Sequence, residues 1–312
     1  MVVAPLTLTC LVLATLFVAI LPIVLYRRLR RPLGLNARDP IAGIAVFALC
    51  AMVIERALNG YVLHQNETTA AWLSNPLVFV IYGALAAGVC EEVGRFVAMK
   101  LMWRRAVAGT AAAAPGAPAN PAADGAVTSA APPATVAATR SSLEARVAMR
   151  RKTAAPTSTG DSTALGYGIG HGGAEAWMVG VLVQIQWIVF AVVENRGELD
   201  TYLGNVPVDS LMRIHLILAS LSPQAAGIFV LERAAALVFQ IGLSVLMWRG
   251  LRAGWRGILP LAIVLHALVD VPAALFQAQL VPLAAVDGVY AVGAVIVAGL
   301  LFRAFRRPAL AA

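Results

Sequence analysis

The chain has 312 residues, of which 60% are hydrophobic and only 13% are charged, and its mean hydropathy is +0.80. Soluble domains average about 45–50% apolar and about 25% charged residues, so this composition excludes an ordinary soluble enzyme or binding domain. The formal net charge of +8 does not indicate a nucleic-acid partner here, because membrane proteins gather arginines in cytoplasmic loops. We therefore expect a multi-pass integral protein of a bacterial plasma membrane, with the lipid bilayer as its surroundings.

Seven apolar blocks reach about 20 residues or more, the length that crosses a hydrocarbon core of about 30 Å. The sequence therefore predicts an all-α polytopic bundle. The expected spans are 4–26, 41–62, 77–103, 163–194, 224–248, 257–278 and 283–303. Glycines interrupt the start of the fourth block, where we expect a short broken helix that is buried in protein.

Arginines alternate between the two sides of this arrangement. The loops after the second, fourth and sixth spans hold only Arg196 and Arg213. Because cytoplasmic loops are enriched in arginine and lysine, the pattern predicts an N-terminus outside, a C-terminus in the cytoplasm and a retained first helix. The clusters after the odd-numbered spans are Arg27, Arg28, Arg30 and Arg31; Arg104 and Arg105; Arg249, Arg252 and Arg256; and Arg303, Arg306 and Arg307.

Two connecting segments differ from the spans. Residues 105–160 are rich in Ala, Pro, Gly, Ser and Thr and poor in large apolar side chains, which predicts a disordered cytoplasmic linker. This linker separates the first three helices, within 1–104, from the last four, within 161–305, and a cytoplasmic tail follows at 306–312. The outer loop at 196–223 carries apolar residues at helical spacing, which predicts an interfacial helix.

Ionisable side chains inside three spans are the main functional signal, because such groups are costly in a bilayer and usually functional. At about 1.5 Å of rise per residue, all of them fall roughly 12–20 Å from the cytoplasmic face, in one layer. Each helix offers a pair at i,i+3 or i,i+4, on one helical face. From the third, fourth and sixth spans respectively, they are Glu91, Glu92 and Arg95; His171 and Glu175; and His266 and Asp270.

Such a cluster suits the activation of water. A carboxylate takes a proton from water, a histidine shares or returns it, and a further donor stabilises the oxyanion. A zinc alternative is also open, because His171, His266 and Glu91 would supply three nitrogen and oxygen ligands and leave a fourth position for water. The sequence lacks the H-E-x-x-H motif, so a simple zincin helix is excluded.

The motifs that carry these residues resemble the CAAX prenyl endopeptidase and Abi (CPBP) group of intramembrane peptidases. They are E-E-x-x-R from Glu91 to Arg95, an aromatic residue four before His171, and H-x-x-x-D from His266 to Asp270. The run G-x-G-H-G-G-x-E from 168 to 175 is more closely similar to the YhfC branch of membrane peptidases. The resemblance covers about 40–305, apart from the linker.

The resemblance implies a peptidase. We expect it to cleave membrane-associated proteins or peptides, with chemistry that opens toward the cytoplasmic half. Glu91 would be the general base and His171 its partner, while His266 and Asp270 would bind the oxyanion or a metal. Arg95 would hold the acidic pair. Glu92 is a further candidate catalytic residue, and Glu175 is a further candidate for orienting the catalytic groups or binding the oxyanion.

The chain also departs from the pattern of the wider group. Its E-E-x-x-R is one residue shorter than the usual E-E-x-x-x-R, and Tyr167 stands where phenylalanine is usual. Asp270 stands where asparagine is frequent in the prenyl-protein enzymes. These differences argue against assuming prenylated substrates.

Other interpretations remain open from the sequence. Glu55 with Arg56 in the second span and Glu232 with Arg233 in the fifth lie near the outer ends, which predicts structural ion pairs that bridge the two helices. Midplane carboxylates and glycine-rich helices also occur in transporters. A non-catalytic membrane scaffold or immunity protein is a further alternative.

Overall fold

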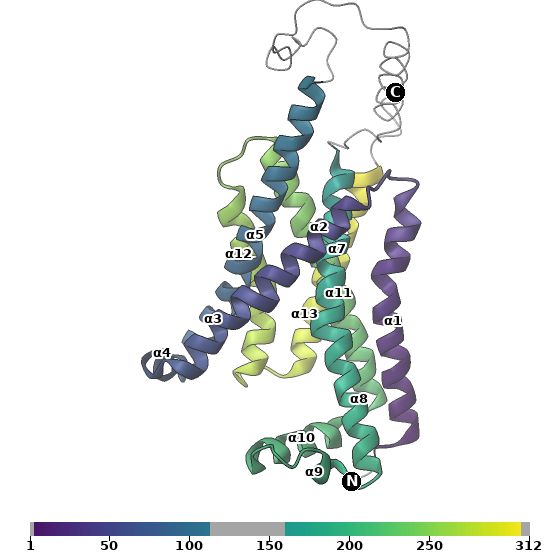
Figure 1. Ribbon diagram of the computed structural model, residues 1–312, viewed down its shortest axis with the longest axis vertical. Coiled ribbons are helices and arrows are strands. Elements are labelled where there is room, and N and C mark those ends of the chain that lie inside the picture. Colours follow the sequence, from purple (N-terminus) through teal and green to yellow (C-terminus); the bar gives the residue numbers. More distant parts are fainter. Residues whose placement is uncertain (1–2, 113–159, 307–312) are drawn as a thin grey trace, which may run out of the picture. The chain divides into compact units, whose positions relative to one another are not determined.

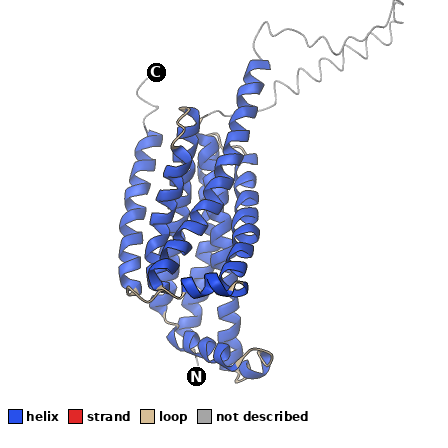
Figure 2. Cartoon of the chain, turned by 90° about the vertical axis from the view of Figure 1, so that its left-hand side faces the viewer, coloured by secondary structure: helices blue, strands red, loops and turns tan. Residues whose placement is uncertain are grey.

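The computed structural model describes residues 3–112 and 160–306, and all regular structure in these ranges is helical (Figures 1 and 2). Seven helical segments within the described ranges are long and apolar enough to span a membrane. Both results confirm the all-α class and the predicted spans, with boundaries that differ by only a few residues. The candidate spans are Pro5–Arg30, Arg38–Gln65, Pro76–Ala108, Asp161–Asn195, Pro223–Arg252, Ile258–Gln277 and Leu283–Phe305.

The first span is a single helix, α1 (Pro5–Arg30). The second span is built from four consecutive helical elements: α2 (Arg38–Leu49), η1 (Cys50–Glu55), α3 (Arg56–Gly60) and η2 (Tyr61–Gln65). The short α4 (Glu67–Leu73) leads into α5 (Pro76–Ala112). The remaining elements are α7 (Asp161–Glu175), η4 (Ala176–Val181), α8 (Leu182–Asn195), α9 (Leu199–Tyr202), α10 (Val208–Ser220), α11 (Pro223–Arg252), α12 (Ile258–Gln277) and α13 (Leu283–Arg306).

The elements η1, η2 and η4 are π-helical turns within otherwise α-helical spans. Such turns are rare and are frequent at functional sites, because the wider turn re-aims the side chains that follow it. One of them, η4, begins directly after Glu175. Hydrophobic periodicity alone gave no sign of these turns.

Glycines bring α7 into direct contact with its neighbours, α2 and α11. A Cβ on Gly170 would strike the Pro40 backbone, and a Cβ on Gly168 would lie 2.8 Å from the Ile241 Cα. Small residues permit such close approach between membrane helices. The glycines therefore serve packing, and α7 runs without the break that we expected at the start of the fourth span.

The connecting segments agree only in part with the sequence analysis. The predicted helix in the outer loop is present as α10, whose Leu218 packs against Phe190 of α8 and Leu199 of α9. The helix α5 continues to Ala112, beyond the predicted start of the linker at 105. From Met102 onward, the described part of α5 belongs to a second compact unit. The rest of the predicted linker, 113–159, and most of the predicted tail, 307–312, lie outside the described residues.

Replacing Gly170 by alanine is expected to destabilise the bundle, because the added methyl group meets the Pro40 backbone and α2 must shift. Overpacking of this kind costs about 1–3 kcal/mol. Gly227→Ala in α11 is the matched control, since nothing lies within 4 Å of its added methyl group. Thermal unfolding in detergent should show a lower midpoint for Gly170→Ala only. Equal midpoints for the two variants would contradict this packing role.

Candidate active site

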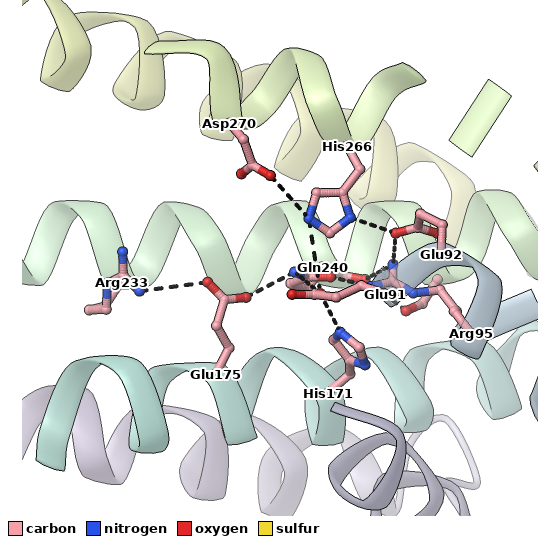
Figure 3. A network of polar contacts seen from close by, with 10 residues as sticks. Glu91, Glu92, Arg95, His171, Glu175, Arg233, Gln240, His266 and Asp270 are labelled. Atoms are coloured by element: carbon pink, nitrogen blue, oxygen red, sulfur yellow. Dashed lines mark hydrogen bonds and ion pairs between the residues drawn. The ribbon is translucent and has the colours of Figure 1, made fainter. Parts of the chain in front are cut away.

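Glu91, His171 and His266 meet in the interior of the bundle, although they come from three different helices. The two histidines approach the Glu91 carboxylate from opposite sides (Figure 3). All three side chains are buried, and His171 has no exposed surface. The helices that carry them are held close by glycine, since a Cβ on Gly88 of α5 would lie 3.0 Å from the Ile263 carbonyl oxygen of α12.

One oxygen of Glu91 collects the polar contacts. Its Oε2 lies 2.9 Å from the His171 Nε2 and 3.9 Å from the His266 Nε2. The Gln240 side-chain amide donates to the same oxygen at 3.2 Å. The other oxygen, Oε1, makes no hydrogen bond with the part of the chain that the structure describes, and Glu91 lines a cavity.

The His266 ring is fixed by two further carboxylates. Its Nδ1 lies 2.8 Å from Oε1 of Glu92, and its Nε2 lies 3.5 Å from Oδ2 of Asp270. A histidine that donates one ring nitrogen to a carboxylate has its orientation and its tautomer set by that bond. The Nε2 edge of His266 is thereby turned toward Glu91 and the cavity.

Arg95 is fully buried and joins the acidic pair to α11. Its Nη1 lies 3.3 Å from Oε1 of Glu92 and donates to the Gln240 main-chain carbonyl at 3.4 Å. Its Nη2 donates to the Gln240 side-chain oxygen. The two adjacent carboxylates therefore share His266, whereas only Glu91 contacts His171 and only Glu92 forms an ion pair with Arg95.

Gln240 is the residue of the network that the sequence analysis missed. It contacts Arg95, Glu91 and Glu175, and its amide donates to Oε2 of Glu175 at 2.9 Å. The signal that could have identified it is a single amide at mid-depth in an apolar span, where a polar group needs partners.

Two aromatic rings pack against His171. Phe47 meets the imidazole edge-on, with ring centroids 5.2 Å apart. Tyr167 stacks on it with centroids 5.9 Å apart. The His171 Nδ1 is buried and has no hydrogen-bond partner among the described residues. The ring is therefore positioned by aromatic packing and by its contact with Glu91.

Two pairings expected from the sequence differ in the structure: that of Glu175 with His171, and the bridge between the second and fifth spans. Glu175 contacts Gln240, and it forms an ion pair with Arg233 at 3.6 Å. Within the described ranges, no ion pair joins Glu55 or Arg56 to the fifth span, so the predicted cross-bridge is absent. The reason is local, because Gly180 of η4 makes room for the Arg233 side chain, which extends toward Glu175.

A cavity of about 460 Å³ reaches this network. Its lining includes Glu91, Glu175, Gln240, His266 and Asp270. Ligand sites typically occupy about 300–1,000 Å³ and combine apolar walls with a few convergent polar groups. These five side chains are therefore accessible to a small molecule or a peptide segment. Glu92, Arg95 and His171 do not line the cavity and contact the lining residues from within the bundle.

The three side chains predicted from the sequence as zinc ligands, His171, His266 and Glu91, meet at the Glu91 carboxylate. Two imidazoles and a carboxylate have suitable chemistry for zinc. However, both Nε2 atoms face one Glu91 oxygen directly, and His171 Nδ1 lacks the acceptor that usually orients a metal-bound histidine. No group of three His, Cys, Asp or Glu side chains in the described residues could hold a metal ion.

Comparison with known proteins connects this network to one family. The sequence model of the YhfC intramembrane metalloprotease family matches residues 17–117 and 137–291. A protein named uncharacterized membrane protein YhfC, from Bacillus subtilis (strain 168), is 28% identical over 267 residues, which cover 85% of this chain and 83% of that protein. No solved structure matches the chain significantly. Every residue of the polar network lies inside the matched ranges.

Arg95→Met is expected to destabilise the protein strongly, because it removes the guanidinium from the buried Glu92 carboxylate and leaves His266 as its remaining ion-pair partner. Breaking a buried pair in this way costs about 3–5 kcal/mol. The double variant Arg95→Met with Glu92→Gln should recover part of that loss, since the new amide oxygen still accepts from His266 Nδ1. Thermal unfolding in detergent measures both, with the exposed Arg56→Met as control. A double variant no more stable than Arg95→Met alone would rule out this account.

Proposed function

Since this chain belongs to the YhfC intramembrane metalloprotease family, we propose that it is an intramembrane peptidase in which Glu91 and His171 activate water against membrane-associated proteins or peptides. The observation that carries the proposal is the buried contact of 2.9 Å between His171 Nε2 and Glu91 Oε2 beside a cavity. The family name supports peptide-bond hydrolysis and suggests a metal, whereas the arrangement of the side chains supports a carboxylate–imidazole pair.

The first step is the attack of water on the scissile carbonyl carbon. A water molecule in the cavity transfers a proton to Oε1 of Glu91 as its oxygen bonds to that carbon. His171 and Gln240 hold the opposite carboxylate oxygen at 2.9 and 3.2 Å, which fixes the direction of the basic lone pairs. A positioned general base contributes about 10²–10⁴-fold to such a reaction.

The attack converts the carbonyl oxygen into an oxyanion, which needs a donor. In its doubly protonated form, His266 donates Nδ1–H to Glu92 and keeps Nε2–H for that oxyanion. Asp270 Oδ2 lies 3.5 Å from the same Nε2. Loss of one oxyanion donor typically lowers the rate by about 10²–10³-fold.

The second step breaks the carbon–nitrogen bond. Glu91 returns the proton it took from water to the departing amine, and the tetrahedral intermediate collapses to a carboxylic acid. The carboxylate and its partners are then restored for a further cycle. Arg95 and Glu92 take no part in the bond changes and act as positioning residues, because they touch His266 and Gln240 behind the cavity wall.

We also propose the orientation that the arginine clusters favour. The ends of α1 and α11 carry Arg27 to Arg30 and Arg249 to Arg252, and these ends would face the cytoplasm. The loop with α9 and α10 would then lie outside.

Glu91→Gln and His171→Ala should each abolish peptide-bond cleavage, because the amide cannot take a proton and the alanine leaves the carboxylate unoriented. A loss of at least about 10²-fold is expected. Mass spectrometry of new protein termini, in membranes that contain each variant, measures the activity, and ¹⁸O from labelled water should appear in the new carboxyl group. Glu67→Gln and His215→Ala, which lie away from the cavity, are the matched controls. Full cleavage by both site variants would refute the proposal.

Metal content separates the two chemistries that the sequence left open. If the carboxylate–imidazole pair acts by itself, detergent-purified protein should contain much less than one zinc per chain, and His171→Ala should contain the same amount. Inductively coupled plasma mass spectrometry measures this ratio. Near-stoichiometric zinc in the wild type that disappears in His171→Ala would overturn the proposed mechanism and favour a metallopeptidase.

A further inference from the structure

The cavity beside Glu91 extends toward only one end of the bundle. Along the second span its lining runs from Phe47 to Leu63, close to the end of η2. Along α12 it runs from His266 to Gln277, the last residue of that helix. On α5 it begins at Phe79, near the helix start. The cavity thus follows the three helices to the end where η2 meets α4.

The opposite direction is closed by tight packing. Beyond the polar layer on α5, α11 and α12, toward the arginine-bearing ends, large side chains are almost completely buried. Gly250 lies against Ile258, and a Cβ on this glycine would be only 2.6 Å from the Ile258 Cδ1. Side chains with at most 1% exposure on this side are Arg95, Met99, Tyr167, Ser244, Met247, Trp248, Ile258 and Ala262.

We propose that the substrate reaches Glu91 from the end of the bundle formed by η2, α4, the start of α5 and the end of α12. This inference rests on the proposed function for the identity of the occupant as a substrate. In the orientation that the arginines favour, this end faces the outside of the cell. The accepted class is therefore peptide segments on the outer side of the membrane. The sequence-based expectation of a site opening toward the cytoplasmic half does not agree with this packing.

The length of the passage limits the form of the substrate. From His266 to Gln277, α12 rises about 16 Å at about 1.5 Å per residue. An extended chain covers that length with about five residues, at about 3.3 Å per residue. A folded domain does not fit in about 460 Å³. The passage therefore admits an extended terminus or a flexible loop.

The charged side chains that line the passage determine which charge a substrate segment can carry. Its lining contains Glu55, Glu175, Glu232 and Asp270 in addition to Glu91, against Arg233 and His266. Arg233 is already paired with Glu175, and neither Glu55 nor Glu232 forms an ion pair with another described residue. The wall therefore repels an anionic segment and favours a neutral or cationic one.

Accessibility of single cysteines tests the route without any need for catalysis. The background is a variant with Cys10, Cys50 and Cys90 replaced by alanine. Ala87→Cys and Ala273→Cys place a thiol on the cavity lining. Val89→Cys and Leu268→Cys are the matched controls on the same helices, because those side chains are 43% and 60% exposed but do not line the cavity. Ser74→Cys, in the exposed turn before α5, marks the proposed access side.

Membrane-impermeant methanethiosulfonate reagents, one cationic and one anionic, are added to intact cells or to inverted vesicles. We expect Ala87→Cys and Ala273→Cys to react from the same side as Ser74→Cys, whereas the lipid-facing controls do not. Relative to Ser74→Cys, the cationic reagent should be favoured over the anionic one by at least about tenfold. Reaction from the opposite side, or none from either side while Ser74→Cys reacts, overturns the route.

A second variant keeps the proposal testable if the cysteine-free protein does not accumulate. Gly83 lines the cavity and has no atom within 4 Å of an added Cβ, so Gly83→Trp fills the passage without a clash at the backbone. Cleavage should be lost, whereas Gly227→Trp should retain it. Full cleavage by Gly83→Trp contradicts the route. Cysteine labelling as expected, with no cleavage by the wild type, would refute the peptidase but not the passage.

Discussion

A guanidinium buried in the centre of an apolar bundle determines how the polar layer is arranged. Arg95 cannot be solvated where it lies, and Glu92 and Gln240 provide acceptors for its two terminal nitrogens, whereas its Nε has no hydrogen-bond partner among the described residues. Such a buried pair adds little net stability, because desolvation offsets most of its attraction. Its effect is positional: Glu92 is directed to His266 and Gln240 to Glu91, so one interaction orients both sides of the proposed reaction centre.

The packing around this polar layer is asymmetric. One side is tightly packed and supports the layer, and the other side holds the cavity through which the layer can be reached. On the arginine-bearing side, glycines and large buried side chains leave no space, as at Gly250 against Ile258. On the other side, the π-helical turn η1 and the glycine at position 83 border an acidic cavity. A rigid support on one side and an open passage on the other are what a buried hydrolytic site requires, since its groups must be fixed while water and substrate still reach them.

Much of the site could be predicted from the sequence because helices are regular. The rise per residue put Glu91, His171 and His266 at one depth, and the structure brings these three side chains into contact. The pairing within the site was less predictable. His171 and Glu175 share a helical face, but Glu175 turns to Gln240 and Arg233. The helical period fixes the face of a residue, whereas its partner depends on which helix packs there.

The sequence by itself determined that the chain is an all-α membrane protein, where the seven candidate spans of the described residues lie, and which layer holds the ionisable groups of the site, because hydrophobic length and helical rise are local properties. Only the tertiary structure decided that Gln240 joins the network, that Arg233 binds Glu175, and that the cavity follows α12 to Gln277. These features depend on the close approach of helices distant in sequence, such as α2, α7 and α11, and that approach is set by side-chain volume at many contacts at once.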